Sequence, residues 1–246
     1  MIEVRELKKQ FGAVKAVDGV SFTAKSGAIT GLLGPNGAGK TTTIRMIGTL
    51  IAIDGGSVKI DDVDVAGDPD GARRACGMLT DSRGVYTRMT ARENIRYYAE
   101  LRGMDTARSE RVLARFVDWL DMGAILDRRT DGFSQGERMK VAITRALIHE
   151  PCNVILDEPT NGLDVMSTRA LRELIKRLKA EGQTVLFSSH VMQEVAALCD
   201  EIIIISKGRV TAQGSTSQLL AMSGKDNLED AFIVLADMHE AQTEAA

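Results

Sequence analysis

The sequence predicts an α/β fold with a mainly parallel sheet, an antiparallel β-subdomain near the N-terminus and an inserted α-helical subdomain. Three observations lead to this prediction. The first third of the 246 residues holds short β-friendly runs broken by glycines, the middle changes to a helical pattern, and the last part alternates strand with helix. Such alternation is typical of parallel crossover units. Because no Pro-rich or Ser-rich linker divides the chain, we expect a single domain.

The predicted strands are short apolar runs bounded by glycines or polar residues. From the N-terminus on, we expect strands at Met1–Leu7, Val17–Ala24, Ile29–Leu33, Asn153–Leu156 and Thr184–Phe187. A further strand pair is expected to flank Gly55-Gly56. We expect the last two strands of the series to be buried on both faces of the sheet.

Four segments have the apolar spacing of amphipathic helices. Thr90 and Ser134 each stand three residues before a glutamate, a capping-box pattern that marks where two of these helices begin. Similar apolar stripes run from Leu113 to Leu120 and from Leu171 to Leu178. Within the single domain 1–246 we expect a β-subdomain at about 1–30 and 55–67, a catalytic core at about 28–54 and 151–215, a helical subdomain at about 82–150 and a C-terminal helical tail at 216–246.

Composition and charge exclude several classes of function. Apolar residues make up 44% of the chain and the formal net charge is −3, so nothing in the charge favours a nucleic-acid partner. No apolar run approaches the roughly 20 residues that span a bilayer. The three cysteines are odd in number and far apart, which argues against a disulfide framework or a zinc site. We therefore expect a cytoplasmic chain that reaches a membrane only through a partner.

The strongest motif is a phosphate-binding loop. Residues 34–41 read Gly-Pro-Asn-Gly-Ala-Gly-Lys-Thr and match G-x-x-x-x-G-K-S/T. Glycines let backbone N–H groups point at a polyphosphate, Lys40 adds a positive charge, and the Thr41 hydroxyl can ligate Mg²⁺. The alternative is a glycine-rich turn with an exposed lysine, but an apolar run precedes the motif and helical spacing follows it. The motif predicts a P-loop NTPase core, with nucleotide contacts also from Gly34, Asn36, Gly37, Gly39 and Thr42.

Two acids and a histidine at strand ends complete the predicted chemistry. Asp157 ends an apolar strand and is suited to hold Mg²⁺ through water, and Glu158 comes next and can take a proton from an attacking water. His190 ends another strand of the same expected sheet, and ligands of such sheets bind beyond the carboxyl ends of the strands. Solvated strand-end acids and a structural histidine are the alternatives. The phosphate loop upstream favours a catalytic role for Glu158, His190 and Lys40.

Five motifs in this order resemble the nucleotide-binding subunits of ABC transporters. They are residues 34–41, 133–137, 156–160 and 162–164, followed by His190, and the resemblance covers essentially the whole chain. It implies ATP and Mg²⁺ as cofactors. It also implies that Phe11 stacks on adenine, the alternative being an aromatic residue packed in a small sheet. Further implied contacts, to ATP held by the other subunit of a dimer, come from Ser134, Gln135, Gly136 and Asp164.

The sequence departs from this family in three places, one of which is Asn161-Gly162 in place of the pair of small residues common before Leu-Asp. Residues 133–137 read Phe-Ser-Gln-Gly-Glu where the family usually has Leu-Ser-Gly-Gly-Gln. Asp81 stands where the family normally has a glutamine that reaches Mg²⁺. An acid can meet a hydrated Mg²⁺, but its shorter side chain argues against direct ligation.

The resemblance implies the ATP-hydrolysing subunit of an exporter. Such a subunit works as a dimer, with a second copy or a paralogue, on a separate integral membrane permease at the inner face of the plasma membrane. Ser82–Tyr98 would form much of the docking surface, with Arg83, Tyr86 and Arg88 as candidate contacts. The amino-acid sequences of segments 81–94 and 187–200 are similar to those of sodium-exporting members of the family, which implies sodium as cargo. A soluble ATPase scaffold and an exporter of drug or lipid cargo are the alternatives.

Overall fold

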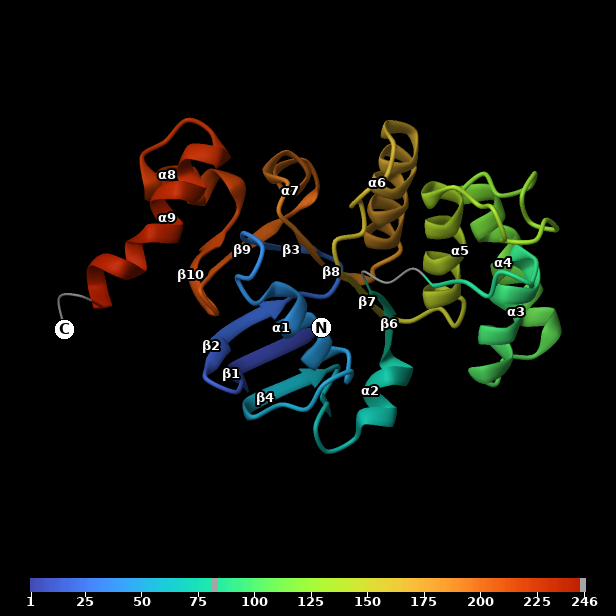
Figure 1. The fold of residues 1–246 in the computed structure, drawn as a ribbon, viewed down its shortest axis with the longest axis horizontal. Helices are drawn as coiled ribbons and strands as arrows, with labels where there is room; N and C mark the ends of the chain where they lie inside the picture. Colours follow the sequence, from blue (N-terminus) through green and yellow to red (C-terminus); the bar gives the residue numbers. More distant parts are fainter. Residues whose placement is uncertain (81–83, 244–246) are drawn as a thin grey trace.

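Two β-sheets and a group of helices form the fold, which a computed structural model describes for residues 1–80 and 84–243, with side chains to residue 236 (Figure 1). The smaller sheet has the strand order β2-β1-β4-β5 and the larger sheet β10-β9-β3-β8-β7-β6. Strands β9 to β6 pair in parallel, and β10 pairs antiparallel with β9 at one edge. The predicted α/β fold with a mainly parallel sheet and an antiparallel N-terminal sheet is confirmed.

Strands and helices alternate along most of the chain. The strands are β1 (Ile2–Phe11), β2 (Val14–Ala24), β3 (Ile29–Leu33), β4 (Gly55–Ile60), β5 (Val63–Asp64), β6 (Cys76–Leu79), β7 (Asn153–Leu156), β8 (Thr184–Ser189), β9 (Glu201–Ser206) and β10 (Arg209–Gly214). The helices are α1 (Lys40–Ile47), α2 (Pro69–Ala75), α3 (Ala91–Leu101), α4 (Thr106–Trp119), α5 (Gln135–Leu147), α6 (Val165–Ala180), α7 (Met192–Leu198), α8 (Thr216–Ser223) and α9 (Leu228–Thr243). Across the described ranges, no helix has the length and apolarity needed to cross a bilayer.

Side chains of the larger sheet divide between two apolar cores because successive residues of a strand point to opposite faces. One core lies between this sheet and the smaller sheet, with α1 enclosed, and takes Leu32, Ile155, Leu186 and Ile203. The neighbouring residues of the same strands face the other core, beneath α5, α6, α7 and α9. The strands read as continuous apolar runs because both faces are buried.

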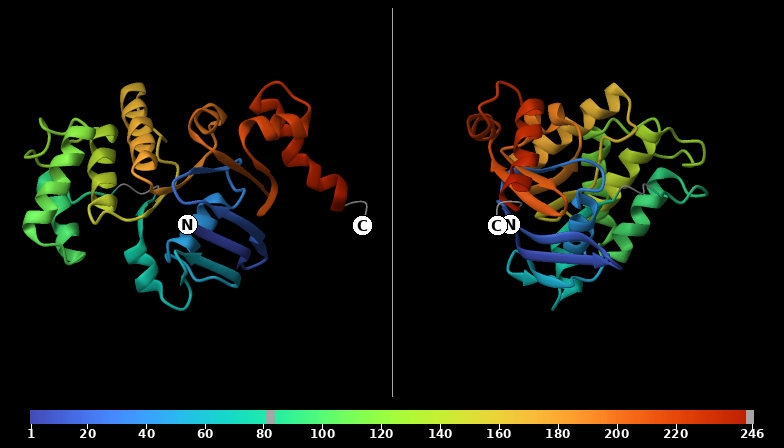
Figure 2. Two further views of the ribbon diagram at one scale, coloured as in Figure 1. Left: turned by 180° about the vertical axis from the view of Figure 1, so that it is seen from behind. Right: turned by 60° about the vertical axis from the view of Figure 1, so that its left-hand side comes forward.

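Helices α3, α4 and α5 gather at the β6 edge of the larger sheet, whereas α8 and α9 lie at the opposite end of the molecule (Figures 1 and 2). Helix α5 packs against α3 and against β6, which joins this helical group to the sheet. The predicted capping boxes at Thr90 and Ser134 are present, each at the N-cap of its helix.

One predicted pair of strands is wrong. Only β4 begins at Gly55, and its partners are β1 and the short β5 rather than a strand immediately before it. Gly56 has φ +80°, and a Cβ there would collide with the backbone carbonyl groups of Arg5 and Glu6 in β1. The glycines therefore allow a close approach between distant strands, and they do not mark a hairpin turn.

Candidate functional site

The phosphate loop connects β3 to α1 and lies at the carboxyl end of the larger sheet. Gly39 is the N-cap of α1, with φ +103°, and a Cβ there would be 2.5 Å from the carbonyl oxygen of Ala16. No side chain caps this helix, and its first turn has no acidic residue. By contrast, α2, α3, α4, α5, α6 and α8 each begin with a side-chain cap. The open N–H groups and the helix dipole of α1 can therefore bind an anion.

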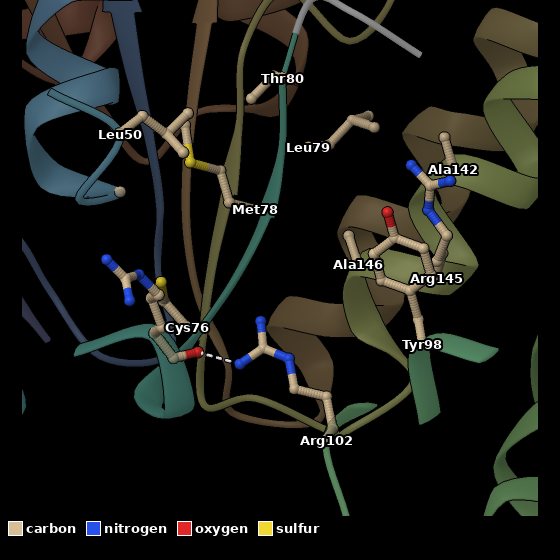
Figure 3. A pocket seen from close by; sticks show the side chains of 12 residues that line it. Leu50, Cys76, Met78, Leu79, Thr80, Tyr98, Arg102, Ala142, Arg145 and Ala146 are labelled. Atoms are coloured by element: carbon tan, nitrogen blue, oxygen red, sulfur yellow. Dashed lines mark hydrogen bonds between the residues drawn. The ribbon is translucent and has the colours of Figure 1, made fainter. Parts of the chain in front are cut away.

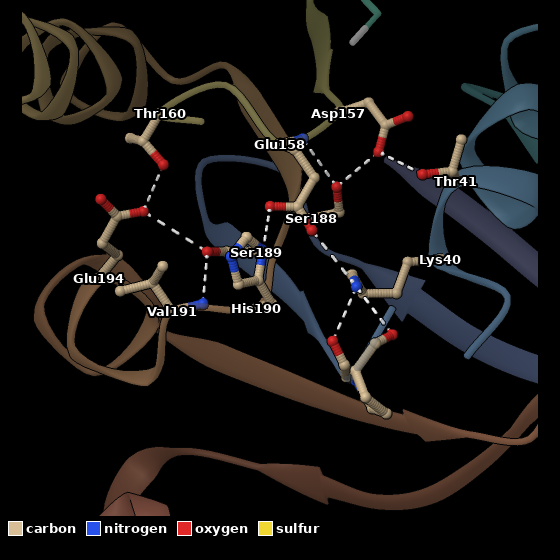
Figure 4. A network of polar contacts seen from close by, with 12 residues as sticks. Lys40, Thr41, Asp157, Glu158, Thr160, Ser188, Ser189, His190, Val191 and Glu194 are labelled. Carbon is tan, nitrogen blue, oxygen red and sulfur yellow. Dashed lines mark hydrogen bonds and ion pairs between the residues drawn. The ribbon is translucent and has the colours of Figure 1, made fainter. Parts of the chain in front are cut away.

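Lys40 turns back across this loop (Figure 4). Its side chain is only 5% exposed, and Nζ donates to the carbonyl oxygens of Gly34 at 2.7 Å and Pro35 at 3.2 Å. Nζ also lies 3.3 Å from Glu158 Oε1. A positive charge is thus held between the loop and the end of β7.

Asp157, Thr41 and Ser188 meet around one carboxylate oxygen. Thr41 Oγ1 donates to Asp157 Oδ1 at 3.1 Å, and Ser188 Oγ donates to the same oxygen at 2.7 Å. Ser188 Oγ in turn accepts from the backbone N–H of Glu158 at 2.9 Å. Strands β7 and β8 are neighbours in the sheet, which is why their ends come together.

The oxygen atoms of Thr41 and Asp157 fit Mg²⁺, which prefers hard oxygen ligands and usually keeps several waters. Within residues 1–80 and 84–236, no group of three or more His, Cys, Asp or Glu side chains could hold a metal ion. A metal at this position would therefore take most of its ligands from water and from phosphate, with Thr41 and Asp157 as the protein groups.

Glu158 lies between Lys40 and His190. Its Oε2 is 2.9 Å from His190 Nδ1, and its side chain is 12% exposed whereas that of His190 is 43% exposed. The backbone of Glu158 is left-handed, with φ +44°, which is uncommon for a residue other than glycine. A carboxylate held in this way can accept a proton from a water molecule.

The segment that begins α5 is bound within its own helix. Ser134 Oγ accepts from the N–H of Glu137 at 3.2 Å, and Glu137 Oε2 accepts from the N–H of Ser134 at 2.8 Å. That second hydrogen bond holds the pKa of Glu137 below its ordinary value. In the described part of the chain, no hydrogen bond joins Ser134, Gln135 or Gly136 to the phosphate loop.

Phe11 and Asp164 lie in different surroundings. Phe11 ends β1 with its side chain 51% exposed, and Lys9 Nζ is 5.6 Å from its ring centroid. Asp164 is the N-cap of α6 and accepts from the N–H of Ser167 at 2.8 Å, which lowers its pKa. Of the other predicted contacts, Asn36 and Gly37 are exposed on the loop and Thr42 is half-buried in α1. Asp81 lies outside the described residues.

Comparison with known proteins decides the family. The family model described as "ABC transporter" matches residues 17–161. The chain belongs to the ABC transporter family. It is 41% identical to the ABC transporter ATP-binding protein NatA of Bacillus subtilis, over 95% of this chain and 97% of that protein. It is 34% identical to the daunorubicin/doxorubicin resistance ATP-binding protein DrrA of Streptomyces peucetius, over 99% of this chain and 72% of that protein.

Solved structures agree with this assignment. The ATP-binding subunit of an ABC transporter superimposes with a TM-score of 0.88 at 30% identity, covering 96% of this chain and 99% of the other. The dimeric ABC transporter cassette MJ0796 shares the fold, with a TM-score of 0.79 at 24% identity, covering 87% and 98%. The chain is thus an ATP-binding ABC subunit homologous to exporter ATPases, and its enzymatic class is ATPase.

One residue of this ABC subunit that sequence reasoning missed is Glu194, in α7. Its carboxylate is buried and accepts from Thr160 Oγ1 at 2.6 Å and from Ser189 Oγ at 3.5 Å. Arg172 of α6 forms an ion pair with it at 3.4 Å. Glu194 thus joins the loop after Glu158 to the residue before His190. One weak signal was available, since Glu194 is an acid in the first turn of a helix that follows closely on a strand-end histidine.

Proposed function

We propose that this ABC ATPase hydrolyses ATP as a dimer, with a second copy of itself or a paralogue. The observation that carries the proposal is the separation of two helix starts within one chain. The start of α1 is open to phosphate, and no hydrogen bond among the described residues links it to Ser134–Gly136. A second chain would bring its own Ser134–Gly136 to the γ-phosphate. The dimeric state of the cassette with the same fold supports this arrangement.

Within each site we assign roles by position. Glu158 accepts the proton of the attacking water, His190 holds Glu158 and reaches the γ-phosphate, and Lys40 balances phosphate charge. Thr41 and Asp157 would hold Mg²⁺, which would supply charge neutralisation at the phosphates. The remaining contacts to ATP in the same chain come from Phe11, Gly34, Asn36, Gly37, Gly39 and Thr42. Those from the other chain come from Ser134, Gln135, Gly136 and Asp164.

We further propose that the dimer drives export through a separate integral membrane permease, which holds it at the inner face of the plasma membrane. The homology to exporter ATPases supports this part of the proposal. Sodium is the first cargo to test, because the sequence resembles the sodium-exporting type and is 41% identical to NatA. Drug or lipid cargo is the alternative, since the relative DrrA is named for drug resistance.

The hydrolysis proposal is tested with Glu158→Gln. This variant should bind ATP normally but turn it over at least about 10²-fold more slowly, the loss expected without a general base. It should also accumulate as an ATP-bound dimer, measured by light scattering after size-exclusion chromatography. Glu173→Gln, an exposed carboxylate on α6, is the matched control and should behave as the unchanged chain. Near-normal turnover by Glu158→Gln would remove Glu158 from its assigned role.

The transport proposal needs the chain together with its membrane partner. Detergent-solubilised membranes should yield a complex of the chain with an integral membrane protein. Cells that express this pair should release loaded ²²Na⁺ faster than cells in which the chain carries Glu158→Gln. A complex that exports a drug but no sodium would select the alternative cargo, and recovery of the chain only in soluble assemblies would contradict transport.

A further inference from the structure

Two charged side chains outside the groups assigned to hydrolysis are withdrawn from solvent. One is Arg145 of α5, which is half-buried, with its guanidinium 4.2 Å from the ring centroid of Tyr98 in α3 (Figure 3). That contact joins two helices of the helical group. The other is Glu194 of α7, whose side chain is only 7% exposed and whose partners stand next to Glu158 and His190 along the chain. The second side chain is therefore the one whose burial bears on the reaction.

The carboxylate of Glu194 meets the conditions under which an acid can be buried. A buried acid needs a counter-charge and hydrogen-bond donors for its oxygen atoms. Arg172 supplies the charge, with its Nη2 3.4 Å from Oε1. The hydroxyl groups of Thr160 and Ser189 donate to the other oxygen, Oε2, at 2.6 Å and 3.5 Å. The two hydroxyl groups come from the ends of neighbouring strands, so one carboxylate oxygen connects them.

The bond from Thr160 reaches the backbone that carries Glu158. Thr160 lies two residues after Glu158, in the loop between β7 and α6, and this loop folds into two successive turns. In the first turn the N–H of Asn161 donates to the carbonyl oxygen of Glu158 at 3.1 Å. In the second the N–H of Leu163 donates to the carbonyl oxygen of Thr160, also at 3.1 Å. Holding Thr160 therefore restrains the left-handed backbone of Glu158, with its φ of +44°.

The bond from Ser189 reaches the backbone that carries His190. Ser189 is buried, and its Oγ also accepts from the N–H of Val191 at 3.0 Å, which closes a turn around His190. The His190 ring then returns to Glu158, with Nδ1 2.9 Å from Oε2. The contacts thus form a closed ring, visible in Figure 4, through Glu158, Thr160, Glu194, Ser189 and His190.

We propose that Glu194 is a positioning residue for ATP hydrolysis, which holds the loop after Glu158 against the end of β8 and thereby keeps His190 aligned with Glu158. The inference rests on the proposed function, because it takes Glu158 and His190 as the groups that act on water and the γ-phosphate. Glu194 acts on these two side chains through Thr160 and Ser189. The hydrogen bond from Thr160 is the shortest of the three noncovalent contacts in the ring, so its loss should loosen the ring most. Small displacements of reacting groups are costly in rate.

Thr160→Val tests this link, because valine has nearly the shape of threonine but lacks the hydroxyl group. It should lower the kcat of the ATPase about tenfold through misalignment of the reacting groups, and leave the ATP affinity of the single chain unchanged. Thr160→Ser keeps the hydroxyl group and should retain most of the kcat. Thr106→Val, at an exposed threonine of α4, is the matched control. A normal kcat in Thr160→Val, or an equal loss in Thr160→Ser, would overturn the inference.

Arg172→Met separates positioning from stability. This change removes the counter-charge of Glu194 but leaves the hydrogen bond from Thr160 in place. In urea titrations it should lower the free energy of unfolding at least as much as Thr160→Val does, because a buried carboxylate loses its ion pair. Its kcat should nevertheless stay close to that of the parent. If kcat falls alike in both variants, in step with stability, Glu194 serves the fold alone and the inference fails.

A signal from the His190 ring tests the alignment in the single chain, without turnover. The chain has three histidines, so selective ¹³C labelling of histidine gives few ring signals, and His190→Gln identifies the one from His190. Thr160→Val should shift or broaden that signal, whereas Thr106→Val should leave it unchanged. An unchanged His190 signal in Thr160→Val would contradict the inference while the proposed function stands. A changed signal together with near-normal turnover by Glu158→Gln would leave the alignment by Glu194 in place and overturn the proposed role of Glu158.

Discussion

Helices α1 and α5 begin in opposite ways, although we propose that both starts meet phosphate. Helix α1 begins at Gly39 with no side-chain cap and no acid in its first turn. Helix α5 begins at Ser134 with a complete capping box, and Glu137 places a negative charge in its first turn. The first start leaves its N–H groups open to an anion, whereas the second satisfies part of its own and repels anions.

This difference suggests that two steps, ATP binding by one chain and closure of the dimer, differ in strength. The phosphate loop can hold ATP in a single chain, because the start of α1 has no side-chain cap and Lys40 Nζ already lies against the loop. The start of α5 offers less to an incoming γ-phosphate, since Glu137 already occupies the N–H of Ser134. Binding by one chain should therefore be the strong step, and closure on the second chain the weaker and reversible one.

The largest expected effect is at the start of α1, which we call the open start because no side chain caps it. Lys40→Ala removes the cation of the loop, and ATP affinity of the single chain should fall roughly 10- to 100-fold, the range expected for losing charge-assisted hydrogen bonds. Fluorescent ATP titration measures this loss, with Lys59→Ala, an exposed lysine of β4, as the control. Unchanged affinity would contradict the assignment of residues 34–41 as the phosphate loop, and the start of α1 could then no longer be contrasted with that of α5 as a phosphate site.

An intermediate effect is expected at the start of α5, which we call the capped start because Ser134 and Glu137 form a capping box there. Asp and Asn both replace Ser well as an N-cap, so Ser134→Asp and Ser134→Asn should both preserve α5. Only the aspartate adds a negative charge against a γ-phosphate, and it should lower steady-state turnover about tenfold relative to the asparagine variant. Single-chain ATP affinity should be equal for both. Equal turnover would mean that Ser134 serves the helix alone.

The smallest effect concerns Glu137, which stands where the family usually has glutamine. Glu137→Gln removes a negative charge close to the proposed γ-phosphate position and should tighten ATP-dependent dimerisation by roughly threefold at low salt. Analytical ultracentrifugation with ATP, in the Glu158→Gln background, measures this change. Weaker dimerisation would show that the acid assists closure.

The same variant has a second, pH-dependent consequence. The N–H of Ser134 lowers the pKa of Glu137 in the folded chain, so this carboxylate stabilises the fold fully above its ordinary pKa of 4.5. The contribution is lost as the pH falls through the lowered folded-state value. In urea titrations at falling pH, the parent should therefore lose stability more steeply than Glu137→Gln, and parallel curves would contradict the assigned cause.

Features carried by consecutive residues were predictable from the sequence, and features that depend on distant contacts were not. The loop 34–41 contains the glycines, the cation and the hydroxyl that its chemistry needs, and β3 was predicted with its observed bounds. Glu194 was missed because its partners Thr160 and Arg172 are 34 and 22 residues away. Gly56 was misread as part of a turn because the strand that approaches it, β1, begins more than fifty residues earlier.

The central claim is that the open start of one chain works with the capped start of another. Mixing Glu158→Gln with Ser134→Asp tests it directly, because Glu158→Gln alone should be nearly inactive and Ser134→Asp alone should have only about a tenth of the turnover of the asparagine variant. If each site is shared between chains, a mixed dimer has one site with both changes and one with neither. With random pairing of equal amounts, ATPase activity should recover to about a quarter of the parent value. Activity that stays at the average of the two variants would contradict shared sites and place both helix starts in one chain's site.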